Sequence, residues 1–190
     1  MKKKVGLVVL AAGSSLRYQG IKLLDEIDGK KMYRYILDTL KDTKMEPKVM
    51  VTQYEEIAQE AEKEGFCVVM NHKPEEGISR SIRLGMEKIL EGYPEIEGMM
   101  FSVSDQPYIK KETIQEIVQA FCDDKGQIVS AAYEEISGNP CVFNKSYFKE
   151  LLCLEGDRGG KCVIKNHGGE VFYLQINNKK ELQDIDIKNV

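Results

Sequence analysis

The chain has 190 residues, of which 42% are hydrophobic and 31% charged, and this length and composition suit one globular domain with a sizeable core. Its net charge of −4 gives no support for a nucleic-acid or anionic-membrane partner, and no apolar run approaches the roughly 20 residues of a transmembrane helix. The 5 cysteines include no Cys-x-x-Cys pair, which argues against a disulfide framework and a zinc site. We therefore expect a cytoplasmic protein with reduced thiols.

Strand-like and helix-like patterns alternate over residues 1–132. The expected strands are short apolar runs at residues 5–10, 48–52, 66–70, 98–103 and 127–132. The expected helices have apolar residues at helical spacing, around residues 32–40 and over residues 54–64, 79–91 and 111–122. This order predicts an α/β fold, a three-layer α/β/α sandwich around a mostly parallel, Rossmann-like sheet. Ligands of such sheets bind beyond the carboxyl ends of the strands.

The alternation breaks after about residue 133. Residues 137–140 predict a turn, residues 141–143 a short strand, and residues 145–154 and 161–166 helices. A strand at 171–174 follows a turn at the glycine pair 168–169. We expect one domain over residues 1–190, in which residues 133–190 elaborate the core formed by residues 1–132.

The first expected strand continues into small residues with two cations behind them. Small side chains in such a turn leave backbone N–H groups open to an anion, and nearby cations neutralise its charge. The segment therefore predicts a polyphosphate site formed by Leu10, Ala11, Ala12, Gly13, Ser14, Ser15, Arg17 and Lys22.

Other interpretations of this segment exist. Basic residues 2–4 before an apolar run resemble the start of a secretory signal peptide, but the run is short and lacks a small-x-small cleavage site. A P-loop needs Gly-x-x-x-x-Gly-Lys-Ser/Thr, whereas Leu23 follows Lys22 here, and the dinucleotide fingerprint Gly-x-Gly-x-x-Gly is absent. A plain βα turn that binds nothing stays open, because Gly and Ser are common turn residues.

A carboxylate lies at the end of the expected strand 98–103. Asp105 would open on the same sheet edge as the small-residue turn, where Mg²⁺ takes one or two protein carboxylates and completes its shell with phosphate and water. The alternative is that Asp105 only forms a turn before Pro107. Asp184 and Asp186 lie two apart on an expected extended segment and share a face, so either is a candidate second carboxylate.

Two further segments carry polar candidates. Asn71 follows a strand, and Ser79 and Ser81 open a helix, where they would form a polar lip over a nucleotide or act only as N-caps. The glycine-rich turn at residues 156–161 is either a plain connection between helices or a second anion site.

Together these motifs resemble the MobA-like branch of the nucleotidyltransferases, and within it the molybdenum cofactor cytidylyltransferases. The family's Leu-Ala-Ala-Gly-x-Ser-x-Arg signature matches residues 10–17, and its lysine falls on Lys22. The weaker motifs match in the same order along nearly the whole chain, at Asn71, Gly77 and Ser81, at Asp105-Gln106-Pro107, at Gly138-Asn139-Pro140, at Gly156-Asp157-Arg158-Gly159 and at Asp184-Ile185-Asp186.

The resemblance implies a Mg²⁺-dependent enzyme that transfers CMP from CTP to the phosphate of molybdenum-molybdopterin and releases pyrophosphate, with a recipient molybdoenzyme as a further partner. It implies that Arg17, Lys22 and Asp105 are catalytic and that Asp105 and Asp186 bind the metal. The nucleotide would lie on residues 10–15, Lys22, Asn71, Ser79 and Ser81, within a nucleotide-binding core over residues 1–132. The acceptor would lie on the elaboration over residues 133–190, which also carries the last metal ligand, at Asn139, Pro140, Gly156, Asp157 and Gly159.

The chain departs from the family pattern at three motifs. Gln19 stands where the family has glycine, so that Gly20 comes one residue late. Ser104 stands where glycine is common, and Ile187 replaces the usual Thr after the last aspartate. The alternatives are therefore transfer of a guanylyl group, transfer of a nucleotide to a sugar or polyol phosphate on the same fold, and noncatalytic delivery of the bound nucleotide or cofactor.

Overall fold

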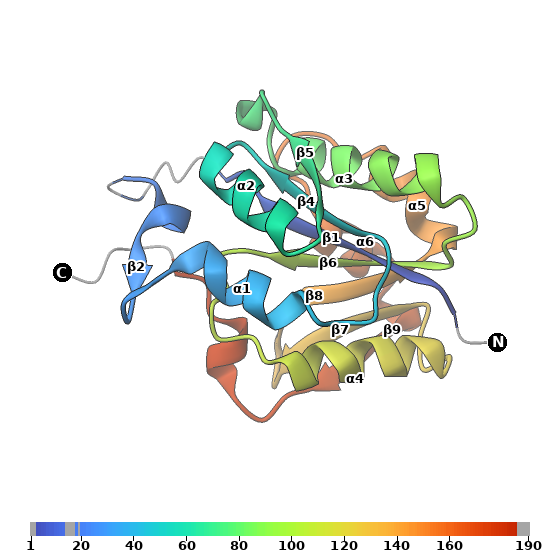
Figure 1. Ribbon diagram of the computed structural model, residues 1–190. Helices are drawn as coiled ribbons and strands as arrows, with labels where there is room; N and C mark the ends of the chain where they lie inside the picture. The colour runs from blue at the N-terminus through green and yellow to red at the C-terminus, as the bar shows by residue number, and fades with distance from the viewer. Residues whose placement is uncertain (1–2, 14–17, 19, 186–190) are drawn as a thin grey trace.

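The computed structural model describes residues 3–13, 18 and 20–185. These residues form a seven-stranded sheet in the order β5-β4-β1-β6-β8-β7-β9 (Figure 1). Every neighbouring pair is parallel except the two pairs that include β8. The strands are β1 (Val5–Ala11), β4 (Lys48–Thr52), β5 (Cys67–Met70), β6 (Gly98–Val103), β7 (Ile128–Tyr133), β8 (Ile136–Asn144) and β9 (Val171–Gln175).

Helices cover both faces of this sheet. One face carries α1 (Met32–Leu40), α2 (Glu55–Lys63) and α4 (Lys111–Cys122), and the other carries α3 (Ile78–Gly92), α5 (Phe148–Leu152) and α6 (Gly160–Asn166) (Figure 1). Each face of the sheet packs against its helices in a hydrophobic core of its own. Because successive strand residues point to opposite faces, Leu7 and Val9 of β1 belong to the core under α1, α2 and α4, whereas Val8 belongs to the core under α3, α5 and α6. The predicted three-layer α/β/α sandwich is confirmed.

Short elements complete the chain. A two-stranded hairpin, β2 (Glu26–Ile27) with β3 (Lys30–Lys31), precedes α1. Single turns of 3₁₀ helix are η1 (Lys22–Leu24), η2 (Pro74–Glu76), η3 (Lys145–Tyr147), η4 (Gly168–Glu170) and η5 (Lys179–Leu182). Among the described residues, no helix is both long and apolar enough to cross a bilayer.

The turn expected at residues 137–140 is wrong, because these residues belong to strand β8. Its register with β7 pairs Ala131 with Gly138 and Ser130 with Cys141, so residues 139–140 form a bulge within the ladder. Pro cannot donate to a ladder and is tolerated in strands at such bulges. The glycine, asparagine and proline of residues 138–140 therefore form a bulge within a strand here, and the chain does not reverse its direction.

The carboxyl ends of β1, β4 and β6 meet at one edge of the sheet. Leu10 pairs with Val51 on one side and with Val103 on the other. Beyond the ladder, the Ser104 amide donates to the Leu10 carbonyl at 3.1 Å. The turns that follow β1 and β6 therefore leave the sheet side by side, as their positions after parallel strands predict.

Candidate active site

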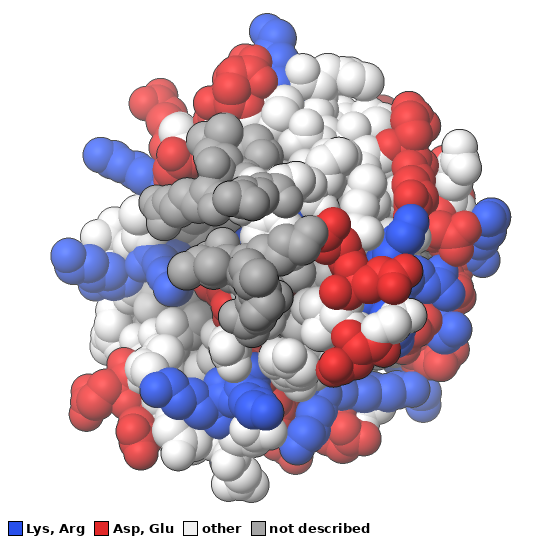
Figure 2. Space-filling model, turned by 90° about the vertical axis from the view of Figure 1, so that its left-hand side faces the viewer, with Lys and Arg blue, Asp and Glu red and all other residues white. Residues whose placement is uncertain are grey.

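Two adjoining cavities lie at this edge of the sheet. They have volumes of about 220 and 260 Å³, and we call them the first and the second cavity. Leu10, Ile78, Val103 and Asp105 line both. Figure 2 shows the face of the molecule that includes this edge, where acidic and basic side chains are interspersed. A shared wall between two cavities suits a reaction that brings two substrates together.

The turn after β1 is held by the end of β4. The Gln53 amide donates to the Ala12 carbonyl and the Tyr54 hydroxyl to the Gly13 carbonyl, both at 2.9 Å. Ala12 and Gly13 line the first cavity. A Cβ at Gly13 would meet no described atom within 4 Å, so the protein's own packing does not require glycine there. The predicted residues Ser14, Ser15 and Arg17 lie outside the described residues.

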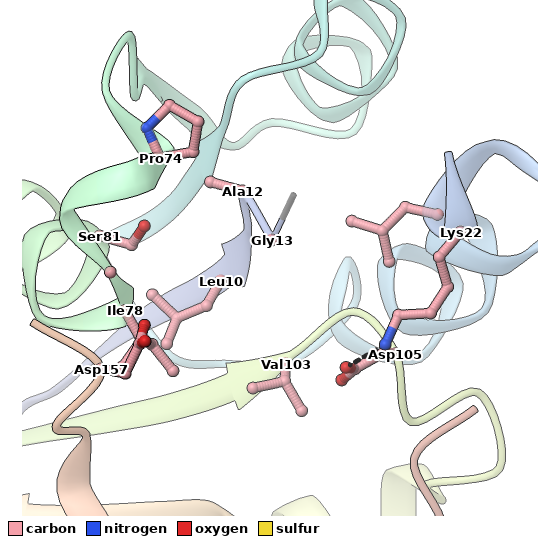
Figure 3. A pocket seen from close by; sticks show the side chains of 12 residues that line it. Leu10, Ala12, Gly13, Lys22, Pro74, Ile78, Ser81, Val103, Asp105 and Asp157 are labelled. Atoms are coloured by element: carbon pink, nitrogen blue, oxygen red, sulfur yellow. Dashed lines mark hydrogen bonds and ion pairs between the residues drawn. The ribbon is translucent and has the colours of Figure 1, made fainter. Parts of the chain in front are cut away.

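Lys22 and Asp105 form an ion pair on one side of the first cavity (Figure 3). The Lys22 Nζ lies 2.9 Å from Asp105 Oδ2, and the two side chains are 13% and 28% exposed. Lys22 begins η1, whereas Asp105 follows β6, so the pair joins two segments that are distant in sequence. Both predicted residues therefore meet at the predicted sheet edge, and Asp105 also lines the second cavity.

The opposite wall of the first cavity is built by two loops in contact. A Cβ on Gly77, whose φ is +87°, would lie 2.3 Å from the Gly156 backbone, so only glycine allows this approach. The Ser79 amide also donates to the Gly156 carbonyl at 3.1 Å. Asp157 consequently lines the first cavity next to Ile78, although the resemblance implied a place for Asp157 with the acceptor (Figure 3).

Asn71 is buried behind this wall and hydrogen-bonds to the residues that form it. Its Nδ2 donates to Ser81 Oγ at 3.0 Å, and its Oδ1 accepts from Arg80 Nε and from the Lys73 amide, each at 3.0 Å. Ser81 lines the first cavity, whereas Asn71 and Ser79 line neither cavity. Asn71 thus contributes by holding Ser81 and Arg80 in place.

The second cavity is mostly apolar. The predicted acceptor residues Asn139 and Gly159 line it, whereas Pro140 and Gly156 line neither cavity. Lys161, at the start of α6, adds a cation. Its other lining residues include the hydrophobic side chains of Leu10, Ile78, Ile82, Phe101, Val103, Cys141 and Ile164.

Cys141 lies in this second cavity as a neutral thiol. Its Sγ is 3.5 Å from Asn139 Oδ1. Burial raises the pKa of the Cys141 thiol to about 12, and the charge of Lys161 offsets only part of this effect. A thiol in this state is a weak nucleophile at neutral pH.

Asp105 and Asp184 bring two carboxylates to the second cavity. The Ile185 amide donates to the Asp105 carbonyl at 3.1 Å, and Gln106 Nε2 donates to Asp184 Oδ1 at 2.8 Å. Within the described part of the chain, no group of three or more Asp, Glu, His or Cys side chains could hold a metal by itself. Two carboxylates fit Mg²⁺, which takes its remaining ligands from phosphate and water. Asp186, the predicted ligand, lies outside the described residues.

Some residues of the site were not singled out individually from the sequence. Gln53 and Tyr54 follow a parallel strand at the predicted edge, so the strand-end rule alone could have found them. Lys161 closes the glycine-rich turn that was already a candidate anion site. Gln106 carried no signal, because its partner Asp184 is 78 residues away in the chain.

Residues 7–171 match the family described as the MobA-like NTP transferase domain. The chain belongs to this family. It is therefore a nucleotidyltransferase, and its nucleotide-diphospho-sugar transferase-like sheet and helices are those of its structural neighbours.

One curated relative of this MobA-like chain is the 3-deoxy-manno-octulosonate cytidylyltransferase of Francisella philomiragia. It is 24% identical over 148 residues, which cover 78% of this chain and 58% of the relative. The chain thus spans less than two thirds of that relative's length.

Solved structures share the fold. Rv0371c from Mycobacterium tuberculosis superposes with a TM-score of 0.80 at 22% identity, over 98% of this chain and 95% of the other. The molybdopterin-guanine dinucleotide biosynthesis protein A from Archaeoglobus fulgidus has a TM-score of 0.71 at 15% identity, over 96% and 93%. At these identities the likeness concerns the fold.

Proposed function

We propose that this MobA-like nucleotidyltransferase moves CMP from CTP to the terminal phosphate of molybdenum-molybdopterin and releases pyrophosphate. The observation that carries the proposal is the 2.9 Å contact between Lys22 and Asp105 in the lining of the first cavity, which Ala12 and Gly13 also line. A cation, a carboxylate and a small-residue turn are what a nucleoside triphosphate and its metal need. The first cavity would hold CTP and the second the acceptor.

The chemistry needs no protein nucleophile. An oxygen of the acceptor phosphate forms a bond to the α-phosphorus of CTP, and the bond from that phosphorus to the bridging oxygen breaks. Pyrophosphate leaves with the electron pair of that bond. The protein's part is to align the two substrates and to neutralise the charge that grows on the pyrophosphate. Lys22 and Arg17 would supply the positive charge.

Magnesium ion would be held by Asp105, with Asp184 or Asp186 as a second carboxylate. When bound, it would supply positive charge that offsets the negative charge of the triphosphate and of the leaving pyrophosphate. A second structure of Rv0371c is a complex with manganese, which supports a divalent metal for proteins of this fold. The oxygen donors of Asp105 and Asp184 suit either ion.

The choice of substrates rests on separate observations. Leu23 and Leu24 after Lys22 favour the cytidylyl branch over the guanylyl branch, and a curated relative is named a cytidylyltransferase. That relative's name includes a sugar acid, which makes transfer to a sugar or polyol acceptor the second candidate. The apolar lining of the second cavity by Ile82, Phe101 and Ile164 favours a ring system over a polyhydroxylated chain.

Residues 1–132 would form the nucleotide-binding part of one domain. Residues 133–190 would supply the acceptor wall and the last metal ligand. A molybdoenzyme that receives the product would be the protein partner.

A panel of substrates with pyrophosphate detection tests this proposal. Each of CTP, GTP, ATP and UTP is combined with Mg²⁺ and with a molybdopterin-type, a sugar-phosphate or a polyol-phosphate acceptor. We expect pyrophosphate only with CTP and the molybdopterin-type acceptor. Release with GTP or with a sugar acceptor would contradict the proposal, and binding of CTP without release in any combination would indicate a delivery protein.

A carboxylate variant and a matched control tie this activity to the site. Asp105→Asn should abolish Mg²⁺-dependent release, because it removes the charge that holds the metal. Asp123→Asn, at the exposed end of α4, should leave the rate unchanged. Near-normal turnover of the Asp105 variant would contradict the metal role of Asp105.

A further inference from the structure

A buried carboxylate stands out in the segment that leads to Asp184. This segment follows β9 and includes η5, whose lysines 179 and 180 are exposed. Glu181 is only 3% exposed. Burial of a carboxylate is costly unless it is well paired and hydrogen-bonded, so a buried Glu in an otherwise exposed turn calls for a specific role.

Glu181 is bonded to the first turn of α4. Its Oε2 accepts from Thr113 Oγ1 at 2.5 Å and from the Lys110 amide at 3.3 Å, while Lys110 Nζ lies 3.5 Å from Oε1. Lys110 is the N-cap residue of α4 and makes no side-chain cap of its own. The first turn of α4 therefore receives its carboxylate from a residue 68 to 71 positions later in the chain.

The same segment is attached to the Asp105 turn a few residues later. Gln106 Nε2 donates to the Leu182 carbonyl at 3.4 Å and to Asp184 Oδ1 at 2.8 Å, and the Ile185 amide donates to the Asp105 carbonyl at 3.1 Å. The Asp105 turn and the first turn of α4 are consecutive parts of one connection from β6. Both attachments therefore hold the segment against the β6–α4 connection.

We propose that Glu181 is a positioning residue, which holds the segment so that Asp184 faces Asp105 in the second cavity. This inference rests on the proposed metal-dependent transfer. A carboxylate with directed donors holds the segment at one register along α4, whereas an apolar side chain would tolerate sliding. Groups that orient metal ligands in this way commonly change metal affinity about 10–100-fold when they are removed.

Manganese binding provides a readout apart from turnover. Free Mn²⁺ is measured by electron paramagnetic resonance in titrations of the full chain with CTP present. Glu181→Ala should weaken Mn²⁺ binding about 10–100-fold. Glu181→Gln should recover most of the affinity, because its amide oxygen still accepts from Thr113. Glu112→Ala, an exposed glutamate on the same helix turn, should change nothing.

A double-substitution cycle separates positioning from general loss of structure. In an Asp184→Asn background, Glu181→Ala should have little further effect on Mn²⁺ affinity, because Glu181 acts through Asp184. Equal losses in both backgrounds would overturn the proposal. Thr113→Val removes one donor and leaves the carboxylate in place, so it tests the same contact if Glu181→Ala unfolds, and its unfolding temperature is compared with that of wild type. It should also weaken Mn²⁺ binding, and wild-type affinity in this variant would overturn the proposal.

The failure of this inference is distinguishable from that of the proposed function. If Glu181→Ala binds Mn²⁺ as wild type does while pyrophosphate release persists, the positioning role is wrong and the transferase function stands. If wild type binds CTP and Mn²⁺ but releases no pyrophosphate with any acceptor, the proposed reaction is wrong. A loss of Mn²⁺ affinity in Glu181→Ala would still support the positioning role in that case.

Discussion

At the residue scale, the Lys22 ammonium is paired with a carboxylate of its own site. Its Nζ lies 2.9 Å from Asp105 Oδ2 in a largely buried position. This pairing restricts the lysine side chain near the place where a triphosphate would lie, so less ordering remains to be done on binding. A pre-positioned charge is most effective when it acts on charge that develops in the transition state.

Lys22→Met should therefore lower kcat more than it raises KM. The expected loss in kcat is roughly 10²–10³-fold, the usual effect of removing one such contact. Steady-state kinetics of pyrophosphate release measure both constants, and Lys88→Met, an exposed lysine on α3, serves as control. An effect on KM alone would mean that Lys22 only binds the ground state.

The thiol of Cys141 should be inert although it lines a cavity. Its raised pKa of about 12, caused mainly by burial, leaves very little thiolate near neutral pH. Mass spectrometry after brief iodoacetamide treatment should find the exposed Cys67 and Cys153 modified and Cys141 unmodified. Denatured protein should be modified at all three positions. Rapid modification of Cys141 in the folded protein would contradict its burial.

At the element scale, the packing of α3 on the sheet depends on Gly85. A Cβ at this position would lie 2.4 Å from Val8 Cγ1 and 3.1 Å from Val51 Cγ2. Both valines are buried in central strands and are stiff at χ1, so neither can move aside cheaply. Gly85→Ala should destabilise the fold by about 1–3 kcal/mol despite the better helix propensity of alanine.

Gly92 provides the matched control on the same helix. A Cβ there would meet no described atom within 4 Å, so Gly92→Ala should be neutral or stabilising by up to about 1 kcal/mol. Urea denaturation of both variants measures the difference. Equal stability of the Gly85 variant and wild type would show that α3 can shift from β1 without cost.

Elements were predictable where they bury an apolar face. The runs at β1, β4 and β6 and the spacing in α4 carry that signal directly. The hairpin β2–β3 was not predicted, because its two strands have only two residues each and these are mostly charged and partly exposed. Strand β8 was predicted only over residues 141–143, because its Gly138-Asn139-Pro140 composition is also typical of a turn, and only the partner strand decides between a turn and a bulge.

At the scale of the whole molecule, the site was predictable where topology brings residues together. Parallel strands end at a common edge, so the approach of Ala12–Gly13 to Asp105 followed from the order of elements. The contact of Gly77 with Gly156 and that of Glu181 with Thr113 join segments far apart in the chain. Local patterns carry no information on such pairs, and so the placement of Asp157 could not be derived, and the pattern could not decide between Asp184 and Asp186 as the partner of Asp105.

The stability of the whole chain should depend on pH at both ends of the range. At the acid end, the 2.6 Å bond from Lys31 lowers the pKa of Glu56 below its ordinary 4.5, against the opposing effect of burial and with further help from the Tyr33 hydroxyl at 3.0 Å. A carboxyl with a lowered folded pKa contributes stability above about pH 4.5, and this contribution is lost as the pH falls. For this half-exposed pair it is at most about 1 kcal/mol.

At the alkaline end, two buried phenols contribute together with the buried Cys141 thiol. Burial, followed by hydrogen bonds to Glu56 and Glu170, raises the pKa of Tyr33 and of Tyr147 from 10.0 to about 12. A raised folded pKa means that the contribution is complete below about pH 10 and is lost as the pH rises toward 12.

Urea midpoints measured from about pH 4 to pH 12 should therefore form a plateau with a shallow acid limb and a steeper alkaline limb. Tyr33→Phe removes one of these buried titrating groups and should reduce the alkaline limb while it also lowers the plateau, because the hydrogen bond to Glu56 is lost. Glu56→Gln should instead reduce the acid limb, to which Asp38 and other carboxyl groups with a lowered pKa still contribute. An alkaline limb of unchanged depth in Tyr33→Phe would show that this phenol does not stay protonated through its burial against α2, and that other groups control the loss of stability.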